Sequence, residues 1–233
     1  MKKEILKSLQ EGIGYSFQNE EMLEQAISHS SYVNEKQINK GESYERTEFL
    51  GDAVLEFIVS KYLFKQYPDK NEGDLTKLRA SLVCEATLST LAREMKFGEY
   101  VFLSKGEEST GGRNRNSILC DLFEAVLGAI YIDGGMKEAE KFVERFLLKD
   151  IEHQSLFYDA KTSLQEIAVK GGYGEIRYEL VKEDGPAHEK TYEAQVLIDE
   201  KVFASGTGQS KKAAEQTAAY EAILILQNSL ILN

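Results

Sequence analysis

Hydrophobic positions recur every three or four residues through the first two thirds of the chain, and this period predicts a run of amphipathic helices. Polar stretches at 29–40 and 104–116 interrupt the pattern and predict loops. Asn19 and Asp74 are expected to cap the helices that follow them. The first expected helix ends near Gly12 or Gly14, and the others cover residues 20–28, 44–66, 74–96, 117–133 and 137–152.

The pattern changes near residue 153, where a short linker at 153–160 precedes segments of a different kind. The sequence then predicts one short helix, three strands and one long helix, because hydrophobic residues alternate in the middle segments. These elements are expected at residues 161–170, 176–181, 191–198, 201–205 and 210–227. The predicted fold is therefore an all-helical N-terminal domain, 1–152, followed by a small α-β-β-β-α domain, 161–233.

The helix expected at 44–66 carries a stripe of acids within an otherwise apolar segment. A helical wheel places four acids on one face, namely Glu45, Glu48, Asp52 and Glu56. Apolar residues such as Phe49 and Phe57 cover the rest, so we expect the helix to be mostly buried. Side chains this close, about 5–6 Å apart at Cβ, repel each other when both are charged unless a cation lies between them. Taken alone, acids on a helix are more typical of a solvated edge of an amphipathic helix.

A second helix, expected at 117–133, repeats this combination with Asp121 and Glu124 in a strongly apolar run. Two such helices suggest one site built from the four carboxylates of Glu48, Asp52, Asp121 and Glu124. An all-oxygen set favours hard cations such as Mg²⁺ or Mn²⁺. Neither helix contains histidine, and the two cysteines have the wrong spacing for a thiolate site, which argues against zinc.

Composition sets the remaining limits. The 233 residues are 42% hydrophobic and carry a formal net charge of −11, which taken alone argues against a nucleic-acid partner. No apolar run is long enough to cross a bilayer, and the first residues lack the apolar segment of a signal peptide. We therefore expect a cytoplasmic protein without a membrane partner. Cys84 and Cys120 fit a reducing compartment and are expected to be small buried side chains.

Two polar segments permit both a structural and a functional interpretation. His29 is expected to be a hydrogen-bonded packing residue or a neighbour of the acidic site. The glycine-rich segment 104–116 is either a surface loop or a loop that presents Arg113 and Arg115 to a phosphate backbone. The sequence leaves these alternatives open.

Several spaced motifs resemble the ribonuclease III family. ERTEFLGDAV at 45–54 is similar to the family signature, and HSSY at 29–32, EGD at 72–74 and NSIL at 116–119 follow in the family's order. Three further motifs resemble the double-stranded-RNA-binding domain: TSLQE at 162–166, GPAH at 185–188 and KKAAEQ at 211–216. The resemblance covers nearly the whole chain. Thr47 stands where the family usually has leucine and lies off the acidic stripe, so we expect a packing change without loss of chemistry.

The resemblance implies a homodimeric endonuclease that cuts double-stranded RNA, as in the processing of rRNA and other precursors, leaving a 5′-phosphate and a 3′-hydroxyl. The metal-binding residues of the family correspond to Glu48, Asp52, Asp121 and Glu124, the same four acids that the helical pattern indicates. Mg²⁺ is the expected cation, and Mn²⁺ is expected to substitute for it. Asp52 or Glu124 is expected to orient the attacking water. Glu45 and Glu72 also match acidic positions, as additional site acids or as structural ion-pair partners.

In the C-terminal domain, the same resemblance implies recognition of duplex shape. Lys211 and Lys212 at a helix N-terminus suit phosphates, His188 suits the minor groove, and Gln165 or Glu166 suits a 2′-hydroxyl. Binding that depends on such a patch should weaken steeply with salt in spite of the acidic total. Two alternatives remain: a module that binds RNA without cutting it, and a phosphohydrolase that acts on nucleotides.

Overall fold

The computed structural model describes residues 2–38, 42–149, 151, 160–185, 190–208 and 210–231, with side chains through 226. The chain divides into two compact units, 1–149 and 150–233, and each unit has its own arrangement of elements. Ala160, expected at the end of the linker, instead begins the first helix of the C-terminal unit, and the rest of the expected linker lies outside the described residues.

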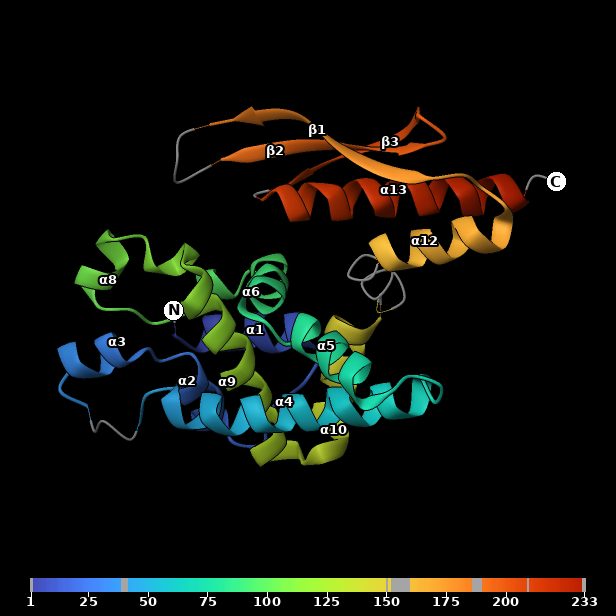
Figure 1. Cartoon of the computed structure of the whole chain (residues 1–233). Helices are drawn as coiled ribbons and strands as arrows, with labels where there is room; N and C mark the ends of the chain where they lie inside the picture. The colour runs from blue at the N-terminus through green and yellow to red at the C-terminus, as the bar shows by residue number, and fades with distance from the viewer. Residues whose placement is uncertain are drawn as a thin grey trace. The chain divides into compact units, whose positions relative to one another are not determined.

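The described part of the N-terminal unit is helical, as the sequence predicts (Figure 1). Its α-helices are α1 Lys2–Ile13, α2 Glu20–Ala26, α3 Ser30–Glu35, α4 Glu45–Gln66, α5 Glu72–Leu82, α6 Glu85–Glu94, α7 Phe97–Tyr100, α8 Lys105–Ser109, α9 Asn116–Gly134 and α10 Met136–Val143. A 3₁₀ turn η2, Gly112–Asn114, precedes α9, and a π-helical turn η3, Glu144–Leu148, follows α10. Helix α9 is the centre of this unit, since nearly every side chain between Ile118 and Ile130 is buried.

Helix α9 crosses α4 at a point where the two backbones touch (Figure 1). A Cβ added at Gly51 would lie 1.9 Å from the carbonyl oxygen of Glu124, and one added at Gly128 would lie 2.1 Å from the carbonyl oxygen of Thr47. Such distances leave room for glycine alone at both positions. Thr47 itself is buried and its hydroxyl donates to the carbonyl oxygen of Tyr44 at 2.7 Å, so the replacement of leucine leaves no unpaired polar group.

The structure corrects several predictions of helix position in this unit. The segment 29–40, expected as a loop, contains α3, because the His29 ring nitrogen accepts the backbone N–H of Ser31 and so caps a helix. The single helix expected at 74–96 is divided into α5 and α6 between Leu82 and Glu85. The hydroxyl of Thr87 donates to the carbonyl oxygen of Ser81 across the break, an alternative to the helical hydrogen-bond ladder.

Helix α5 also begins earlier than expected. The side-chain oxygen of Asn71 accepts the backbone N–H of Asp74, so Asn71 is the cap and Asp74 lies within the first turn. The segment 104–116, expected as a loop, contains the short helix α8 as well as η2. These corrections change local helix ends and leave the all-helical class of the unit intact.

The C-terminal unit confirms the predicted order α-β-β-β-α. Its elements are α12 Ala160–Gly171, β1 Ile176–Asp184, β2 Thr191–Ile198, β3 Lys201–Gly208 and α13 Lys211–Ile231. The strands form an antiparallel sheet in the order β1-β2-β3, with Ile176 opposite Ile198 and Ile198 opposite Lys201. Leu164 of α12, Val196 of β2 and the alanines of α13 form the core between the helices and the sheet.

Among the described residues, no helix is long and apolar enough to cross a bilayer.

Candidate active site

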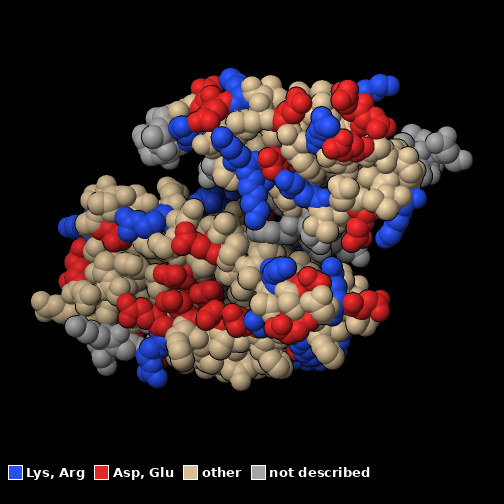
Figure 2. Space-filling view, in the orientation of Figure 1, with Lys and Arg blue, Asp and Glu red and all other residues tan. Residues whose placement is uncertain are grey.

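The acids of α4 and α9 gather around the helix crossing. Gly51 packs against the backbone of Glu124, and Asp52 follows Gly51 directly in the sequence. The helix crossing therefore brings Asp52 and Glu124 into the same region. Glu48 lies one turn earlier on α4, and Asp121 one turn earlier on α9. Acidic side chains form a band on the face of the N-terminal unit that Figure 2 shows.

Electrostatic coupling shows that the acids of the two helices act on each other. Burial raises the pKa of Glu48 to about 7, with further contributions from the charges of Asp121, Glu45 and Asp52. Burial likewise raises the pKa of Glu124 to about 8, with Asp52, Glu48 and Asp121 adding to the shift. Carboxyl groups so perturbed favour protonation or a bound cation.

A buried tyrosine holds one of these acids. The Tyr44 hydroxyl donates to Oδ2 of Asp121 at 3.0 Å, and Tyr44 is only 3% exposed. Burial raises the pKa of Asp121, and the hydrogen bond from Tyr44 opposes that rise. His29 packs edge-on against the Tyr44 ring at 5.5 Å between centroids, which makes it a neighbour of the site as well as the cap of α3.

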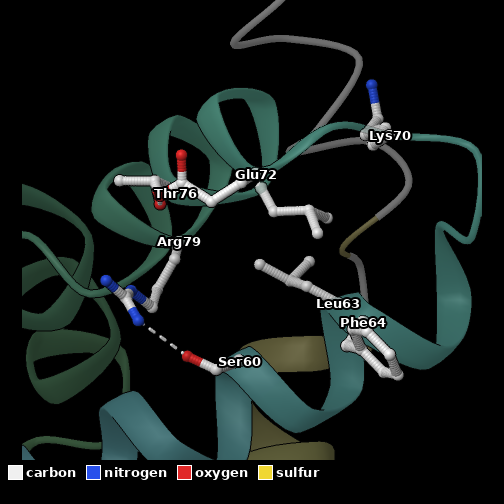
Figure 3. A pocket seen from close by; sticks show the side chains of 8 residues that line it. Ser60, Leu63, Phe64, Lys70, Glu72, Thr76 and Arg79 are labelled. Atoms are coloured by element: carbon white, nitrogen blue, oxygen red, sulfur yellow. Dashed lines mark hydrogen bonds between the residues drawn. The ribbon is translucent and has the colours of Figure 1, made fainter.

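The two additional acids occupy different surroundings. Glu45 begins α4, accepts the Ser43 hydroxyl at 3.4 Å, and contributes to the raised pKa of Glu48. Glu72 begins α5 and lines a cavity of about 460 Å³ between α5 and the last turns of α4 (Figure 3). There it accepts the Thr76 hydroxyl at 3.0 Å. The α4 part of this cavity begins at Ser60, eight residues beyond Asp52 and so roughly 12 Å along the helix. Within one chain Glu72 therefore lies apart from the other acids.

Cys120 lies beside the acids of the candidate site, a position that the sequence reasoning missed. Its sulfur lies 4.0 Å from Oε1 of Glu124, and the candidate ligand atoms of Cys120, Asp121 and Glu124 all lie within 4.8 Å of one another. Glu48 and Asp52 lie outside that compact group. The prediction that the cysteines are small buried residues is confirmed for Cys120, while Cys84 is half-buried. Cys120 and Glu124 are four residues apart on a helix, and this spacing could have predicted that their side chains are neighbours.

Arg113 and Arg115 are engaged within the N-terminal unit. Arg113 donates to the carbonyl oxygens of Gly98 and Val101, both at 2.9 Å, and forms an ion pair with Glu108. Arg115 forms an ion pair with Glu107. These contacts favour the structural interpretation of the segment, since the arginines hold η2 against α7 and α8.

The predicted RNA-binding residues lie on the surface of the C-terminal unit as far as they are described. Lys211 and Lys212 are exposed in the first turn of α13, and Gln165 and Glu166 are exposed on α12. Glu166 forms an exposed ion pair with Lys170 at 3.6 Å, one turn further along α12. His188 lies outside the described residues.

One stability prediction follows from the raised pKa values of Glu48 and Glu124. Both exceed the ordinary glutamate value of about 4.3, so the native protein binds more protons than the unfolded chain between about pH 4.3 and pH 8. Stability in a chelator should therefore fall as pH rises through this window. Because both groups are partly solvated, we expect about 1–2 kcal/mol.

Urea unfolding at pH 5.5 and pH 8 measures this loss. The variant Glu48→Gln should show a smaller loss than the wild-type protein, and Mg²⁺ should remove most of it at pH 8. An identical pH dependence in the variant and the wild type would contradict the coupling between the acids.

The fold and the site together define a class: a helical nuclease unit with an acidic centre, joined to a small α/β unit of the RNA-binding type. The family model described as "Ribonuclease-III-like" matches residues 19–151, and the model described as "Double-stranded RNA binding motif" matches residues 160–226. The chain belongs to the ribonuclease III family, whose members depend on divalent cations. It is an endoribonuclease that acts on double-stranded RNA.

The chain is similar along most of its length to bacterial proteins named Ribonuclease 3. It is 49% identical to that of Shouchella clausii over 215 residues, which cover 91% of this chain and 83% of the relative. It is 48% identical to that of Bacillus licheniformis over 228 residues, 97% of this chain and 92% of the relative. The solved nuclease domain of ribonuclease III from Campylobacter jejuni covers 62% of this chain and 96% of its own, with 37% identity and a TM-score of 0.58.

Proposed function

We propose that four carboxylates hold the catalytic divalent cations, with Mg²⁺ as the cation used and Mn²⁺ as a substitute. The four residues are Glu48 and Asp52 of α4 and Asp121 and Glu124 of α9. The observation that carries this proposal is the close contact of α4 with α9 at Gly51, which brings the acids of the two helices together. Burial, and then repulsion between these acids, raises the pKa of Glu48 and of Glu124. Oxygen-only donors of this kind suit a hard cation, and a bound cation would relieve the repulsion.

When bound, the cations supply an acidified water and neutralise charge on the departing 3′ oxygen. In the proposed mechanism, Asp52 or Glu124 orients the attacking water through an oxygen that is not engaged in metal binding. Tyr44 fixes the Asp121 carboxylate from the buried side, so that Asp121 needs no reorganisation as substrate arrives. The products carry a 5′-phosphate and a 3′-hydroxyl. Glu45 adds negative charge at the edge of the site.

The Tyr44 hydroxyl gives a prediction of its own. Tyr44→Phe removes the hydrogen bond to Asp121 and should raise the Mg²⁺ concentration for half-maximal cleavage by about tenfold, with recovery at saturating Mg²⁺. Tyr32→Phe is the matched control, because Tyr32 packs on Phe102 in the same unit. A Tyr44→Phe variant with an unchanged Mg²⁺ requirement would contradict the positioning role.

Duplex RNA is held by the C-terminal unit in this proposal. Lys211 and Lys212 bind phosphates by their charge at the N-terminus of α13, where the helix dipole favours anions. Gln165 or Glu166 of α12 contacts 2′-hydroxyls, and His188 enters the minor groove. We propose that residues 1–152 form the endonuclease domain and residues 161–233 the RNA-binding domain. The relatives are bacterial proteins, and bacterial RNA is made in the cytoplasm, so the cytoplasm is the proposed location of the reaction.

A homodimer is proposed from an apolar stripe on α4. Phe49, Phe57 and Phe64 are 80%, 54% and 74% exposed, although the sequence led us to expect a mostly buried helix. Exposed aromatic side chains on one helix mark an interface. The solved nuclease domain from Campylobacter jejuni is described as flexible in a region involved in dimer formation. A two-fold interface would bury each phenylalanine twice, once in each copy.

Phe49→Ser should therefore weaken the dimer strongly. Burial of a phenylalanine contributes about 1.5–3 kcal/mol, and two copies give about 3–6 kcal/mol, or roughly 10²–10⁴ in dissociation constant. Sedimentation across a concentration series measures the shift. Val169→Ser, in the exposed part of α12, is the control that should leave the dimer unchanged. A dimer unaffected by Phe49→Ser would exclude this surface.

The function itself is tested by comparing substrates and cations. We expect cleavage of a long RNA duplex in Mg²⁺ or Mn²⁺, no cleavage of it in a chelator, and little turnover of single-stranded RNA or nucleotides. Binding of the duplex without cleavage in either cation would favour the alternative of a pure RNA-binding module. Turnover of nucleotides alone would favour the alternative of a phosphohydrolase.

A further inference from the structure

A buried thiol and two half-buried carboxylates of α9 lie close together. Cys120 is 9% exposed, and its sulfur points along the helix to Glu124, with 4.0 Å between Sγ and Oε1. Asp121 completes the group, since one candidate ligand atom from each of the three residues lies within 4.8 Å of the other two. The proposed Mg²⁺ site uses only the oxygens of this group.

The distances suit a metal that accepts sulfur. Zinc binds thiolate sulfur at about 2.3 Å and carboxylate oxygen at about 2.0–2.2 Å in tetrahedral geometry, which puts the donor atoms roughly 3.6 Å apart. The 4.0 Å between Sγ of Cys120 and Oε1 of Glu124 is near that separation, and all three donor atoms lie within 4.8 Å of one another. Small rotations of the Cys120 and Glu124 side chains would close the set around Asp121, which the Tyr44 hydroxyl holds in place.

We infer that Cys120, Asp121 and Glu124 form a mixed sulfur and oxygen site for a thiophilic divalent cation of the zinc and cadmium class. This site rests on the proposed function, because it shares Asp121 and Glu124 with the proposed Mg²⁺ site. The Cys120 thiol releases its proton to solvent as the sulfur–metal bond forms, and no oxidation is involved. A cation held here occupies two of the four carboxylates and so excludes Mg²⁺ and stops cleavage.

The donor set determines the selectivity of this site. Mg²⁺ demands oxygen ligands in near-octahedral geometry and gains nothing from sulfur, whereas zinc and cadmium gain a strong bond. Loss of an outer-shell partner already costs a metal site about 10–100-fold in affinity, so loss of the sulfur ligand should cost at least that much. The second cysteine supplies a matched control. The Cys84 thiol donates to the carbonyl oxygen of Ser81 at 3.3 Å and approaches the Thr87 hydroxyl at the start of α6.

Cadmium is the probe, because a cadmium–thiolate bond produces an ultraviolet charge-transfer band. The full chain, freed of metal, is titrated with Cd²⁺ as wild type, Cys120→Ser and Cys84→Ser. We expect a saturable band in the wild type and in Cys84→Ser, and its loss in Cys120→Ser, with Cd²⁺ affinity reduced by at least roughly 10–100-fold. Thermal melting of each variant verifies that it is folded. Cd²⁺ should inhibit Mg²⁺-dependent cleavage by the wild type at concentrations that leave Cys120→Ser active.

The outcomes separate this inference from the proposed function. Normal Mg²⁺-dependent cleavage by the wild type without a band, or with a band that is lost in Cys84→Ser, overturns the inference and leaves the function standing. A Cys120-dependent band in a protein that needs no divalent cation for cleavage supports the sulfur site and overturns the proposed function. A Cys120-dependent band that excess Mg²⁺ suppresses is the result expected if the two sites overlap.

Discussion

Replacing Glu124 by glutamine should abolish cleavage and leave RNA binding intact. The amide cannot hold a cation by charge or take up a proton from water, so the rate in excess Mg²⁺ should fall at least ~1,000-fold, or about 4 kcal/mol in the activation barrier. RNA affinity should stay within about twofold, because the proposed phosphate and 2′-hydroxyl contacts belong to the C-terminal unit.

Glu56→Gln is the matched control for this change. Glu56 is an exposed acid on α4, on the same stripe as Glu48 and Asp52 but one turn beyond them, and its replacement should leave cleavage unchanged. Both variants are measured for duplex binding and for cleavage over a range of Mg²⁺ concentrations. Near-normal cleavage by Glu124→Gln in excess Mg²⁺ would remove Glu124 from the chemistry.

Gly51→Ala should break the helix crossing and lose both stability and activity. The new methyl group would lie 1.9 Å from the carbonyl oxygen of Glu124 and 3.0 Å from the backbone nitrogen of Gly128, so α4 and α9 must separate. Overpacking of this kind costs about 3 kcal/mol or more when backbone atoms are the obstacle. Separation of the helices also separates Asp52 from Glu124, so cleavage should fall beyond the loss expected from unfolding.

Gly12→Ala makes the identical chemical change where nothing obstructs it. Gly12 lies in α1 with no atom within 4 Å of an added Cβ, and alanine there should stabilise the protein by about 0.5–1 kcal/mol. Urea unfolding and cleavage by the folded fraction are compared for both variants. Equal stability of Gly51→Ala and Gly12→Ala would show that the two helices do not meet at Gly51.

The sequence predicted the class of each unit and the segments that carry the acids, because these depend on local patterns. The period of hydrophobic residues fixed α4 and α9 almost to the residue, and the alternation in 191–198 fixed β2. The same period continued across residues 83–84, so it predicted one helix where a side-chain hydrogen bond from Thr87 divides α5 from α6. The hydrophobic period also gives no information about the His29 ring nitrogen that caps α3, so this helix was not predicted.

A local sequence pattern could not predict features that depend on contact with another surface. The sequence shows that Phe49 and Phe57 are apolar but not that they lack a cover within the chain. Glycine inside a helix is unfavourable by about 1 kcal/mol. The crossing of α4 and α9 explains why glycine stands at positions 51 and 128, because a larger side chain would collide with the other backbone. The spacing of the two cysteines carries no information about Cys120, whose neighbour is the carboxylate of Glu124 one helical turn further on.

Crystals grown with Mn²⁺ and measured for anomalous scattering would test the account most directly. We expect anomalous density beside the crossing of α4 and α9, bonded to at least one carboxylate oxygen from each helix, with Glu48 or Asp52 on one side and Asp121 or Glu124 on the other. Manganese bound to one helix alone, or bound elsewhere while these acids point apart, would contradict a cation centre shared by the two helices.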